Sequence, residues 1–216
     1  MVNDRFAMLR HRMVAEQIQA RGIRDERILA AMEEIPRHRF VPPHLADRAY
    51  DDAPLPIGEG QTISQPYIVA QMTHALRLTG MEKVLEVGTG SGYQTSLLCR
   101  LAGEVVTIER FAVLYAAAEE LLRELGMENV RFRVGDGTVG VPEEAPFDRI
   151  LVTAAAPDVP DPLFEQLADG GILVIPLGGR WEQDLVRVRK KAGAAKKEFL
   201  GGCRFVPLIG QCGFAD

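Results

Sequence analysis

The sequence predicts an α/β protein with a doubly wound, mostly parallel sheet, N-terminal helices and a C-terminal antiparallel strand pair. From residue 83 onward, short apolar runs alternate with amphipathic stretches of helical period, which is typical of strands joined by crossover helices. A glycine-rich turn also follows the first apolar run directly, at the position where such sheets bind ligands. We expect a single domain over residues 1–216, because this length suffices for one core.

The first sixty residues are expected to form a cap of helices and loop. Apolar side chains recur at helical spacing between residues 5 and 34, and Gly22 interrupts them, which predicts two helices. Between residues 35 and 60, prolines and glycines are frequent enough to disfavour regular structure, so we expect a long ordered loop. The predicted division is a cap over residues 1–60 and an α/β core over residues 61–216.

The core should contain five parallel strands with helices between them. The predicted strands are Lys83–Val87, Glu104–Glu109, Val130–Val134, Arg149–Thr153 and Gly171–Pro176. The predicted helices are Gly92–Leu101, Ala112–Leu125 and Pro162–Leu167. At the C-terminus we expect Asp184–Arg189 and Cys203–Gln211 to pair at the sheet edge, with Lys190–Lys197 as a solvated turn between them.

Composition limits the partners and the compartment. A formal charge of -5 leaves no broad basic surface, so nucleic acid is not an expected partner. The N-terminus has no long apolar run, so we expect neither a signal peptide nor a membrane span, and a cytoplasmic location. The cysteines Cys99, Cys203 and Cys212 lack metal-ligand spacing and are expected to be reduced and buried. The oligomeric state is not fixed by the sequence, although a monomer is favoured.

The glycine-rich turn carries the first candidate binding residues. The stretch VLEVGTGSGYQ places Gly88, Gly90 and Gly92 between a strand and a helix, where backbone can approach a ligand closely. A dinucleotide fingerprint would need glycine at Tyr93, and a phosphate loop would end in Gly-Lys-Ser/Thr. The spacing here resembles the S-adenosylmethionine loop of Rossmann-like methyltransferases. The alternative is a tight turn with no ligand.

Acidic residues lie in or after three predicted strands. Glu109 ends the second strand and could accept hydrogen bonds from both hydroxyls of a ribose. Asp136 follows the third strand and could accept one from an adenine amine, while Gly137 leaves room for the ring. Glu86, inside the first strand, could accept one from the cofactor's ammonium group, or could instead brace the glycine loop. Each acid alone could be an ordinary structural residue, but their succession favours bound S-adenosylmethionine.

The residues expected near the methyl group favour a carboxylate as the acceptor. After the fourth strand the chain reads Thr153-Ala-Ala-Ala-Pro, without the Asn/Asp-Pro-Pro-aromatic signature of base-amine methylation and without acids to hold a metal. A carboxylate is ionised at neutral pH, since its reference pKa is roughly 4. It needs only donors to orient it, and Ser64 with the backbone amides after it could supply them. Ser64 could instead cap the helix that follows it.

Together these motifs closely resemble the protein-L-isoaspartate O-methyltransferase family over nearly the whole chain. The matching segments are LPIGEGQTISQPYIVA at 55–70, VLEVGTGSGYQ at 84–94, GDG at 135–137, APFDRILVTAAAP at 145–157, GGILVIPLG at 170–178 and RFVPLIG at 204–210. The QTISQP and RFVPL stretches are specific to that family among methyltransferases, whereas the glycine loop is shared widely.

The resemblance implies a metal-free, S-adenosylmethionine-dependent repair enzyme with a Rossmann-like methyltransferase sheet. The serine of the ISQP motif, here Ser64, is the family's active-site residue, and the glycine loop with Glu109 and Asp136 would contact the cofactor. The implied substrate is the free α-carboxylate of L-isoaspartyl residues in damaged peptides and proteins, whose ester re-forms a succinimide that opens partly to aspartate. We also expect the tail around Val206 to offer a backbone edge to an extended peptide.

Two other functions stay open at this point. A nicotinamide oxidoreductase on the same fold predicts changes in NADH fluorescence on binding, and the glycine spacing argues against it. A non-enzymatic adaptor would bind the cofactor and the damaged protein without forming an ester, and Ser64→Ala would then leave its function nearly intact.

Overall fold

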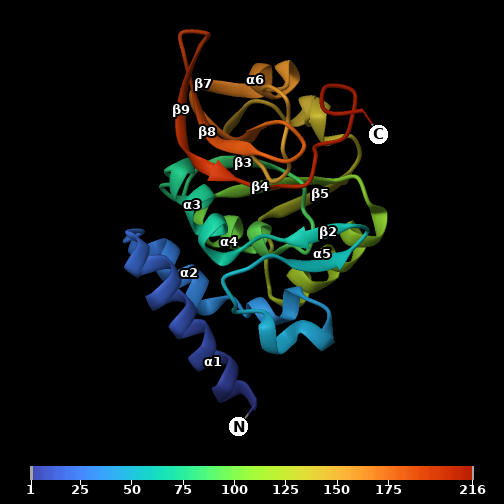
Figure 1. Cartoon of the computed structure of the whole chain (residues 1–216). Helices are drawn as coiled ribbons and strands as arrows, with labels where there is room; N and C mark the ends of the chain where they lie inside the picture. The colour runs from blue at the N-terminus through green and yellow to red at the C-terminus, as the bar shows by residue number, and fades with distance from the viewer. Residues whose placement is uncertain (1, 216) are drawn as a thin grey trace.

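A seven-stranded sheet forms the centre of the molecule, in the order β5-β4-β3-β6-β7-β8-β9 (Figure 1). The computed structural model describes residues 2–215. The parallel strands are β3 (Lys83–Val87), β4 (Glu104–Glu109), β5 (Val130–Val134), β6 (Phe147–Val152) and β7 (Leu167–Gly178). The antiparallel strands are β8 (Gln183–Lys191) and β9 (Ala194–Cys203). The predicted doubly wound, mostly parallel sheet is confirmed.

The strand order reverses at β3, and this reversal positions the binding crevice. From β3 the chain continues through β4 to β5 on one side and then returns to β6 on the other side of β3. Loops that leave the carboxyl ends of β3 and β6 therefore diverge, and a crevice opens between them. The glycine-rich turn follows β3 at this point.

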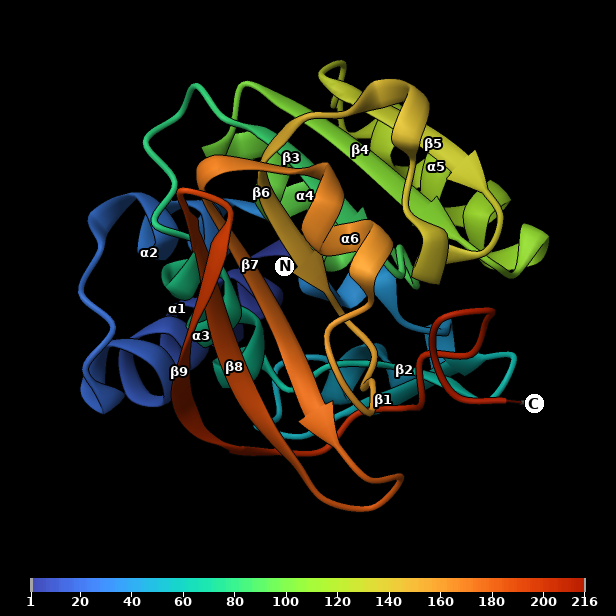
Figure 2. The same ribbon diagram turned by 90° about the horizontal axis from the view of Figure 1, so that it is seen from above.

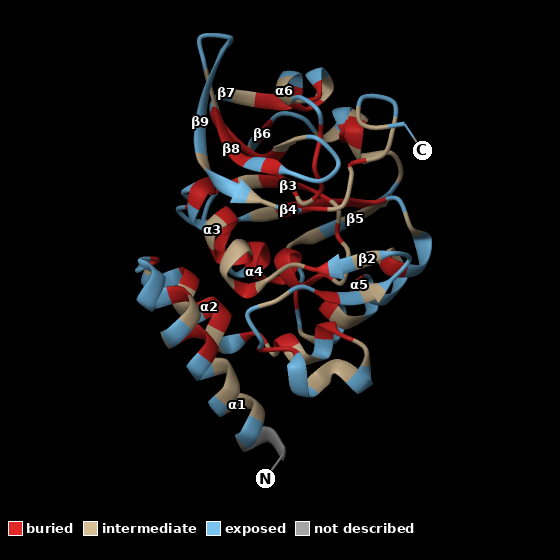
Figure 3. Cartoon of the chain, viewed as in Figure 1, coloured by how far each residue is buried: buried red, intermediate tan, exposed pale blue. Residues whose placement is uncertain are grey.

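Helices cover both faces of the sheet. The core helices are α3 (Pro66–Leu76), α4 (Tyr93–Leu101), α5 (Ala112–Glu124) and α6 (Asp161–Gln166). Because successive strand residues point to opposite faces, Val84 packs into one core with α3 and α4, and Leu85 packs into a second core with α6. Figure 2 shows α6 on one face and α1 and α3 on the other. Buried residues follow the strands and the inward sides of the helices (Figure 3).

Two helical segments open the chain, as predicted. They comprise α1 (Val2–Arg12), a π-helix at Met13–Ile18, a 3₁₀-helix at Gln19–Arg21 and then α2 (Glu26–Glu34). Gly22 ends the first segment with a φ of 97°, a left-handed conformation that favours glycine. Asp25 begins the second by accepting a hydrogen bond from the amide of Arg27 at 3.0 Å.

The predicted loop over residues 35–60 contains more regular structure than expected. It includes 3₁₀-helices at Arg37–Phe40 and Pro43–Arg48 and the strand β1 (Leu55–Gly58), which pairs with β2 (Gln61–Ile63). Prolines disfavour long helices and central strands, but short 3₁₀ turns and a two-stranded ribbon accommodate them. The predicted boundary at residue 60 therefore falls inside a hairpin.

The prediction for the C-terminal strand pair is wrong in its second strand. β8 pairs with Ala194–Cys203 and not with Cys203–Gln211, and only Ala192 and Gly193 form the turn. Most of the Lys190–Lys197 run therefore lies inside strands. Exposed lysines are common on edge strands because they oppose pairing with another chain, so the charge pattern did not identify a loop.

Two further expectations concern membranes and cysteines. Within residues 2–215, no helix combines the length and the apolar character needed to cross a bilayer. Cys99 is buried as expected and Cys203 is half-buried, but Cys212 is exposed, so the prediction of buried thiols is wrong there.

Candidate active site

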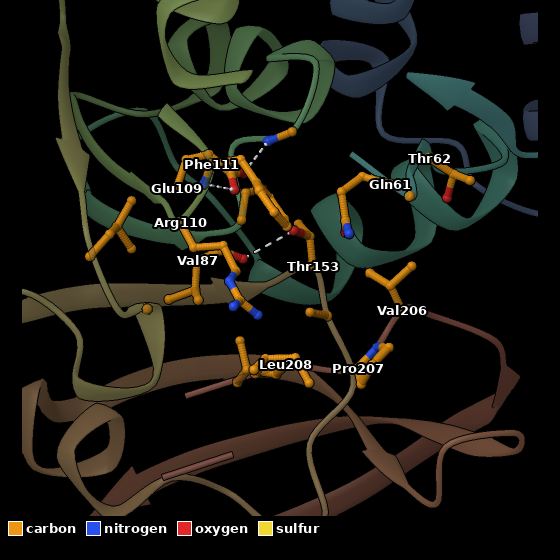
Figure 4. Close-up of a pocket in the computed structure, with 17 residues that line it drawn as sticks. Gln61, Thr62, Val87, Glu109, Arg110, Phe111, Thr153, Val206, Pro207 and Leu208 are labelled. Carbon is orange, nitrogen blue, oxygen red and sulfur yellow. Dashed lines mark hydrogen bonds between the residues drawn. The ribbon is translucent and has the colours of Figure 1, made fainter. Parts of the chain in front are cut away.

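Three adjoining cavities lie at the carboxyl ends of the central strands. The first, of about 190 Å³, lies between the ends of β3 and β4 and the tail residues 206–209 (Figure 4). The second, of about 50 Å³, lies between the glycine loop and Ser64. The third, of about 210 Å³, lies between Ser64 and residues 202–206. Thr62 and Thr153 line all three, so the cavities form one crevice.

The glycine loop is shaped by close contact with its neighbours. Gly88 has a φ of 95°, and a Cβ there would lie 2.3 Å from Oγ1 of Thr153. That hydroxyl shares its one proton between the carbonyls of Val87 and Gly88, at 3.0 and 2.7 Å. A Cβ on Gly92 would lie 2.7 Å from Leu122 of α5, so this glycine allows helix packing. Gly88 and Gly90 are the loop glycines that border the first two cavities.

Glu109 borders the first cavity with its carboxylate already oriented. Oε2 accepts a hydrogen bond from the amide of Gly90 at 2.9 Å, and Oε1 accepts one from the amide of Phe111 at 3.0 Å (Figure 4). Each oxygen retains a further lone pair. The carboxylate can therefore brace the glycine loop and still accept hydrogen bonds from two ribose hydroxyls.

Asp136 binds the C-terminal tail in this structure. Its carboxylate accepts hydrogen bonds from the amide and hydroxyl of Thr138 at 2.8 and 2.6 Å, and from the amide of Gln211 at 2.8 Å. Burial acts to raise the pKa of Asp136, but the bonds from Thr138 and Gln211 outweigh it and hold the pKa below its usual range. Gly137 borders the first cavity, and a Cβ there would lie 2.5 Å from Val87. Asp136 thus connects the end of β5 to the tail that closes the cavity.

Glu86 lies beneath the crevice and is fully buried. It accepts hydrogen bonds from the hydroxyls of Thr95 and Thr107 at 2.5 and 2.7 Å, and it lines none of the three cavities. Burial raises its pKa to about 8, and the nearby charge of Glu109 acts in the same direction. A carboxyl that is protonated at neutral pH attracts an ammonium group weakly. Thr107 also shares a hydrogen bond of 2.6 Å with the hydroxyl of Thr89 in the glycine loop, so the geometry favours an indirect bracing role. The cofactor contact stays a prediction.

Ser64 lies between β2 and α3 and borders the second and third cavities. Gln65 is the N-cap residue of α3 and no side chain caps this helix, so the interpretation of Ser64 as a helix cap is wrong. The carbonyl of Ser64 accepts a hydrogen bond from Nη2 of Arg37 at 2.7 Å. Among the side chains of residues 5–215, Oγ of Ser64 has no hydrogen-bond partner, and this leaves the hydroxyl available to a ligand.

The tail around Val206 pairs with its own chain. The amide of Ala155 donates to the carbonyl of Val206 at 2.8 Å, and the amide of Leu208 donates to the carbonyl of Ala155 at 2.7 Å. The carbonyl of Val206 is therefore occupied, and an approaching peptide would have to meet another part of the tail. Val206 itself borders the first and third cavities.

The sequence assigned no role to three residues in or beside this crevice. Thr153 follows β6 at the same sheet edge as Glu109, so the strand-end rule that identified Glu109 could have found it. Thr62 precedes the ISQP motif by one residue and carried no separate signal. Arg37 is 27 residues from Ser64 in the chain, and no local pattern connects them. Within the described part of the chain, no three His, Cys, Asp or Glu side chains gather closely enough to hold a metal ion.

Comparison with known proteins identifies relatives that share one family description. The family model described as protein-L-isoaspartate(D-aspartate) O-methyltransferase (PCMT) matches residues 8–213. The protein-L-isoaspartate O-methyltransferase of Syntrophus aciditrophicus is 61% identical over 215 residues, covering 98% of this chain and 99% of its own. That of Geobacter metallireducens is 55% identical over 210 residues, with 97% of each chain covered.

Two solved structures share the whole fold. One, a protein-L-isoaspartate O-methyltransferase, has a TM-score of 0.83 at 31% identity and covers 94% of this chain and 67% of its own. The other is assigned as a beta-aspartate methyltransferase (PCMT) from Plasmodium falciparum and was crystallised with S-adenosyl-L-homocysteine. It has a TM-score of 0.79 at 26% identity and covers 93% of this chain and 98% of its own.

Proposed function

This chain belongs to the protein-L-isoaspartate(D-aspartate) O-methyltransferase family, and we propose that it performs the family's reaction in the crevice around Ser64. It transfers a methyl group from S-adenosylmethionine to the free α-carboxylate of L-isoaspartyl residues and so begins their repair to aspartyl residues. One observation carries the placement: Ser64, the glycine loop and the tail, which are distant in sequence, border cavities that share Thr62 and Thr153.

The residues of the first cavity fit the cofactor. Gly88 and Gly137 leave space at two positions where a side chain would collide with its neighbours, and Glu109 presents an oriented carboxylate. We assign cofactor contacts to Gly88, Gly90, Glu109 and Gly137, with Gly92 and Asp136 shaping the cavity around them. When bound, S-adenosylmethionine supplies an electrophilic methyl group on a sulfonium.

The residues of the third cavity suit a carboxylate acceptor. An isoaspartyl carboxylate is ionised at neutral pH, so the site needs no general base and must mainly orient the group and exclude water. The hydroxyl of Thr153 already donates to backbone carbonyls, whereas the hydroxyl of Ser64 is available to donate to a ligand. Ser64 also precedes the N-terminus of α3, where the helix dipole favours an anion. We therefore assign the acceptor contact to Ser64.

The test compares paired peptides that differ only in isoaspartate or aspartate at one position. With labelled S-adenosylmethionine, we expect incorporation into the isoaspartyl peptide alone, in a product that releases methanol in base as an ester does. Equal incorporation into both peptides would reject the substrate assignment. A base-stable product would reject the carboxylate as the acceptor.

We further propose that the protein works as a cytoplasmic monomer, without nucleic acid or a membrane as partner. The acidic balance of the chain, with a formal charge of -5, supports the absence of a nucleic-acid partner. Light scattering coupled to size exclusion should give the mass of one 23.8 kDa chain, and a dimer mass would refute the monomer.

A further inference from the structure

Arg37 is a buried cation in a setting that normally excludes one. Its side chain is 0% exposed, and no carboxylate of residues 5–215 forms an ion pair with it. Nε donates to the carbonyl of Ala49 and Nη2 donates to the carbonyl of Ser64, each at 2.7 Å. Arginine is rarely fully buried unless it is paired, because desolvation of the charge is costly. Here Nε and Nη2 are satisfied by backbone carbonyls, whereas the buried Nη1 has no hydrogen-bond partner among the described residues.

The contacts of Arg37 join three parts of the protein. Ala49 belongs to the N-terminal cap, and Ser64 belongs to the segment between β2 and α3. The guanidinium also lies over the ring of Tyr93, 4.7 Å from its centroid. Tyr93 is the first residue of α4, directly after Gly92, and it lines the second cavity. One side chain therefore spans the cap, the acceptor segment and the end of the glycine loop.

The local chain does little to fix Ser64 by itself. No side chain caps α3, and Gln65 at the cap position has a non-helical conformation, with φ of -49° and ψ of 137°. Among the described side chains, that of Arg37 alone forms a hydrogen bond with the main chain of Ser64. A planar guanidinium can bind two carbonyls in fixed directions, which an ammonium group cannot reproduce.

We propose that Arg37 is a positioning residue. It holds the backbone of Ser64 so that the Ser64 hydroxyl faces the acceptor carboxylate, at a fixed position relative to the glycine loop. This inference rests on the proposed function. Arg37 lines none of the three cavities, so it acts through Ser64. A displacement of about 1 Å at a reacting group can reduce a rate by on the order of 100-fold.

The experiment uses Arg37→Met and Arg37→Lys, with Arg149→Met as the matched control. Arg149 also binds a backbone carbonyl, that of Leu76 at 2.6 Å, and unlike Arg37 it pairs with a carboxylate, that of Glu82 at 3.3 Å. It lies in the first half of β6 and lines none of the three cavities. We expect kcat/KM for the isoaspartyl peptide to fall on the order of 100-fold in Arg37→Met and by less in Arg37→Lys. The dissociation constant of S-adenosylhomocysteine, measured by calorimetry, should stay within about threefold. Arg149→Met should keep its kcat/KM per folded molecule.

A double variant separates positioning from general stabilisation. If Arg37 acts through the Ser64 hydroxyl, Arg37→Met should cost little activity in a Ser64→Ala background. The inference would be overturned if the kcat/KM losses of Arg37→Met and Ser64→Ala multiply in the double variant. It would also be overturned if Arg37→Met keeps its kcat/KM, or if Arg149→Met loses as much kcat/KM as Arg37→Met. Should Arg37→Met fail to fold, Arg37→Lys carries the same comparison. A wild-type protein that does not distinguish isoaspartate from aspartate would instead refute the proposed function.

Discussion

The two sides of the crevice are built in different ways. On the glycine-loop side, Glu109 accepts hydrogen bonds from two backbone amides, and Thr153 donates to two backbone carbonyls. On the Ser64 side, the hydroxyl of Ser64 has no partner among residues 5–215, and the main chain is held by an arginine from the cap. The first side is therefore shaped before a ligand arrives, whereas the second leaves its key donor free.

This difference matches the two ligands of the reaction. The cofactor is the same in every turnover, so a cavity with a fixed shape does not limit which substrates can react. It also reduces the entropy lost on binding. The acceptor is one chemical group carried by many peptide sequences. A site that orients the carboxylate through a few donors, beside a cavity of about 210 Å³ for the flanking chain, suits that variety.

The largest effect should come from Gly88→Ala on the rigid side. The new Cβ would meet Oγ1 of Thr153 at 2.3 Å, and the φ of 95° is unfavourable for alanine. We expect a loss of about 3 kcal/mol in the free energy of unfolding. Affinity for S-adenosylhomocysteine should fall by at least about tenfold, since the loop must move. Urea unfolding and calorimetry measure the two quantities.

Gly126→Ala is the control for Gly88→Ala. Gly126 has a φ of 70°, but a Cβ there would meet no atom within 4 Å. It should lose about 1 kcal/mol of stability and keep its affinity for S-adenosylhomocysteine. Equal losses in the two variants would show that the backbone angle, and not contact with Thr153, makes Gly88 necessary.

Ser64→Ala should have the next largest effect, and only on the acceptor side. We expect kcat/KM for the isoaspartyl peptide to fall about 100-fold, equivalent to about 2.7 kcal/mol, with cofactor affinity unchanged. Ser96→Ala is the control, because Ser96 is buried and donates to the carbonyl of Tyr93 without lining the crevice. If the activity of Ser64→Ala merely follows its fraction of folded protein, Ser64 has no catalytic role.

Glu86→Gln tests whether the carboxyl of Glu86, beneath the glycine-loop side, is neutral in the folded protein. In the fold Glu86 keeps its proton up to about pH 8, whereas its ordinary pKa is 4.5. Between these values only the unfolded chain releases the proton, so the stability from Glu86 falls as pH rises, by up to about 1.4 kcal/mol per unit. The free energy of unfolding of the wild type, relative to that of Glu86→Gln, should therefore fall by about 2 kcal/mol between pH 5.5 and pH 7. Urea unfolding at several pH values measures it.

Glu82→Gln is the control for this pH dependence. Burial acts to raise the pKa of Glu82, but hydrogen bonds from Thr79 and its neighbours outweigh it and hold the pKa below the usual range. Its contribution is lost only as pH falls below about 4.5, so the variant should show no slope between pH 5.5 and pH 7. A flat difference for Glu86→Gln as well would mean that Glu86 is charged in the fold, as an ammonium contact requires.

The same contrast explains how far the sequence could predict this molecule. Glu109 and the loop glycines occupy fixed positions relative to strands, so period and spacing identify them. Arg37 has no such position, because its function depends on a tertiary contact with Ser64. The β8–β9 pairing was missed for a related reason: lysines that suggest a loop are also usual on an edge strand.

Ser64 shows a second limit of local patterns. A serine two residues before a proline is a good N-cap candidate, yet the helix begins one residue later than that interpretation needs. The motif identified the residue, and only the structure shows that its hydroxyl is left free. Likewise, the Gly-Asp-Gly stretch identified Asp136 but gave no sign that the tail occupies its carboxylate.

The smallest effect should come from Asp136→Asn, at the boundary between the two sides. Asp136 joins β5 to Gln211 of the tail, and the tail closes the first cavity while also bordering the third. An amide can accept only part of these bonds, so we expect a loss of about 1 kcal/mol in stability and a decrease of a few-fold in affinity for S-adenosylhomocysteine.

Asp25→Asn is the matched control for that change, because Asp25 also accepts a hydrogen bond from a backbone amide but lies far from the crevice, at the start of α2. It should change stability by a similar amount or less and leave both ligands unaffected. If Asp136→Asn weakens binding of the isoaspartyl peptide as much as binding of S-adenosylhomocysteine, the tail serves both sides. The cofactor side and the acceptor side of the crevice would then be coupled through Asp136 as well as through Arg37. If only cofactor affinity falls, the tail belongs to the rigid side, and Arg37 alone connects the halves.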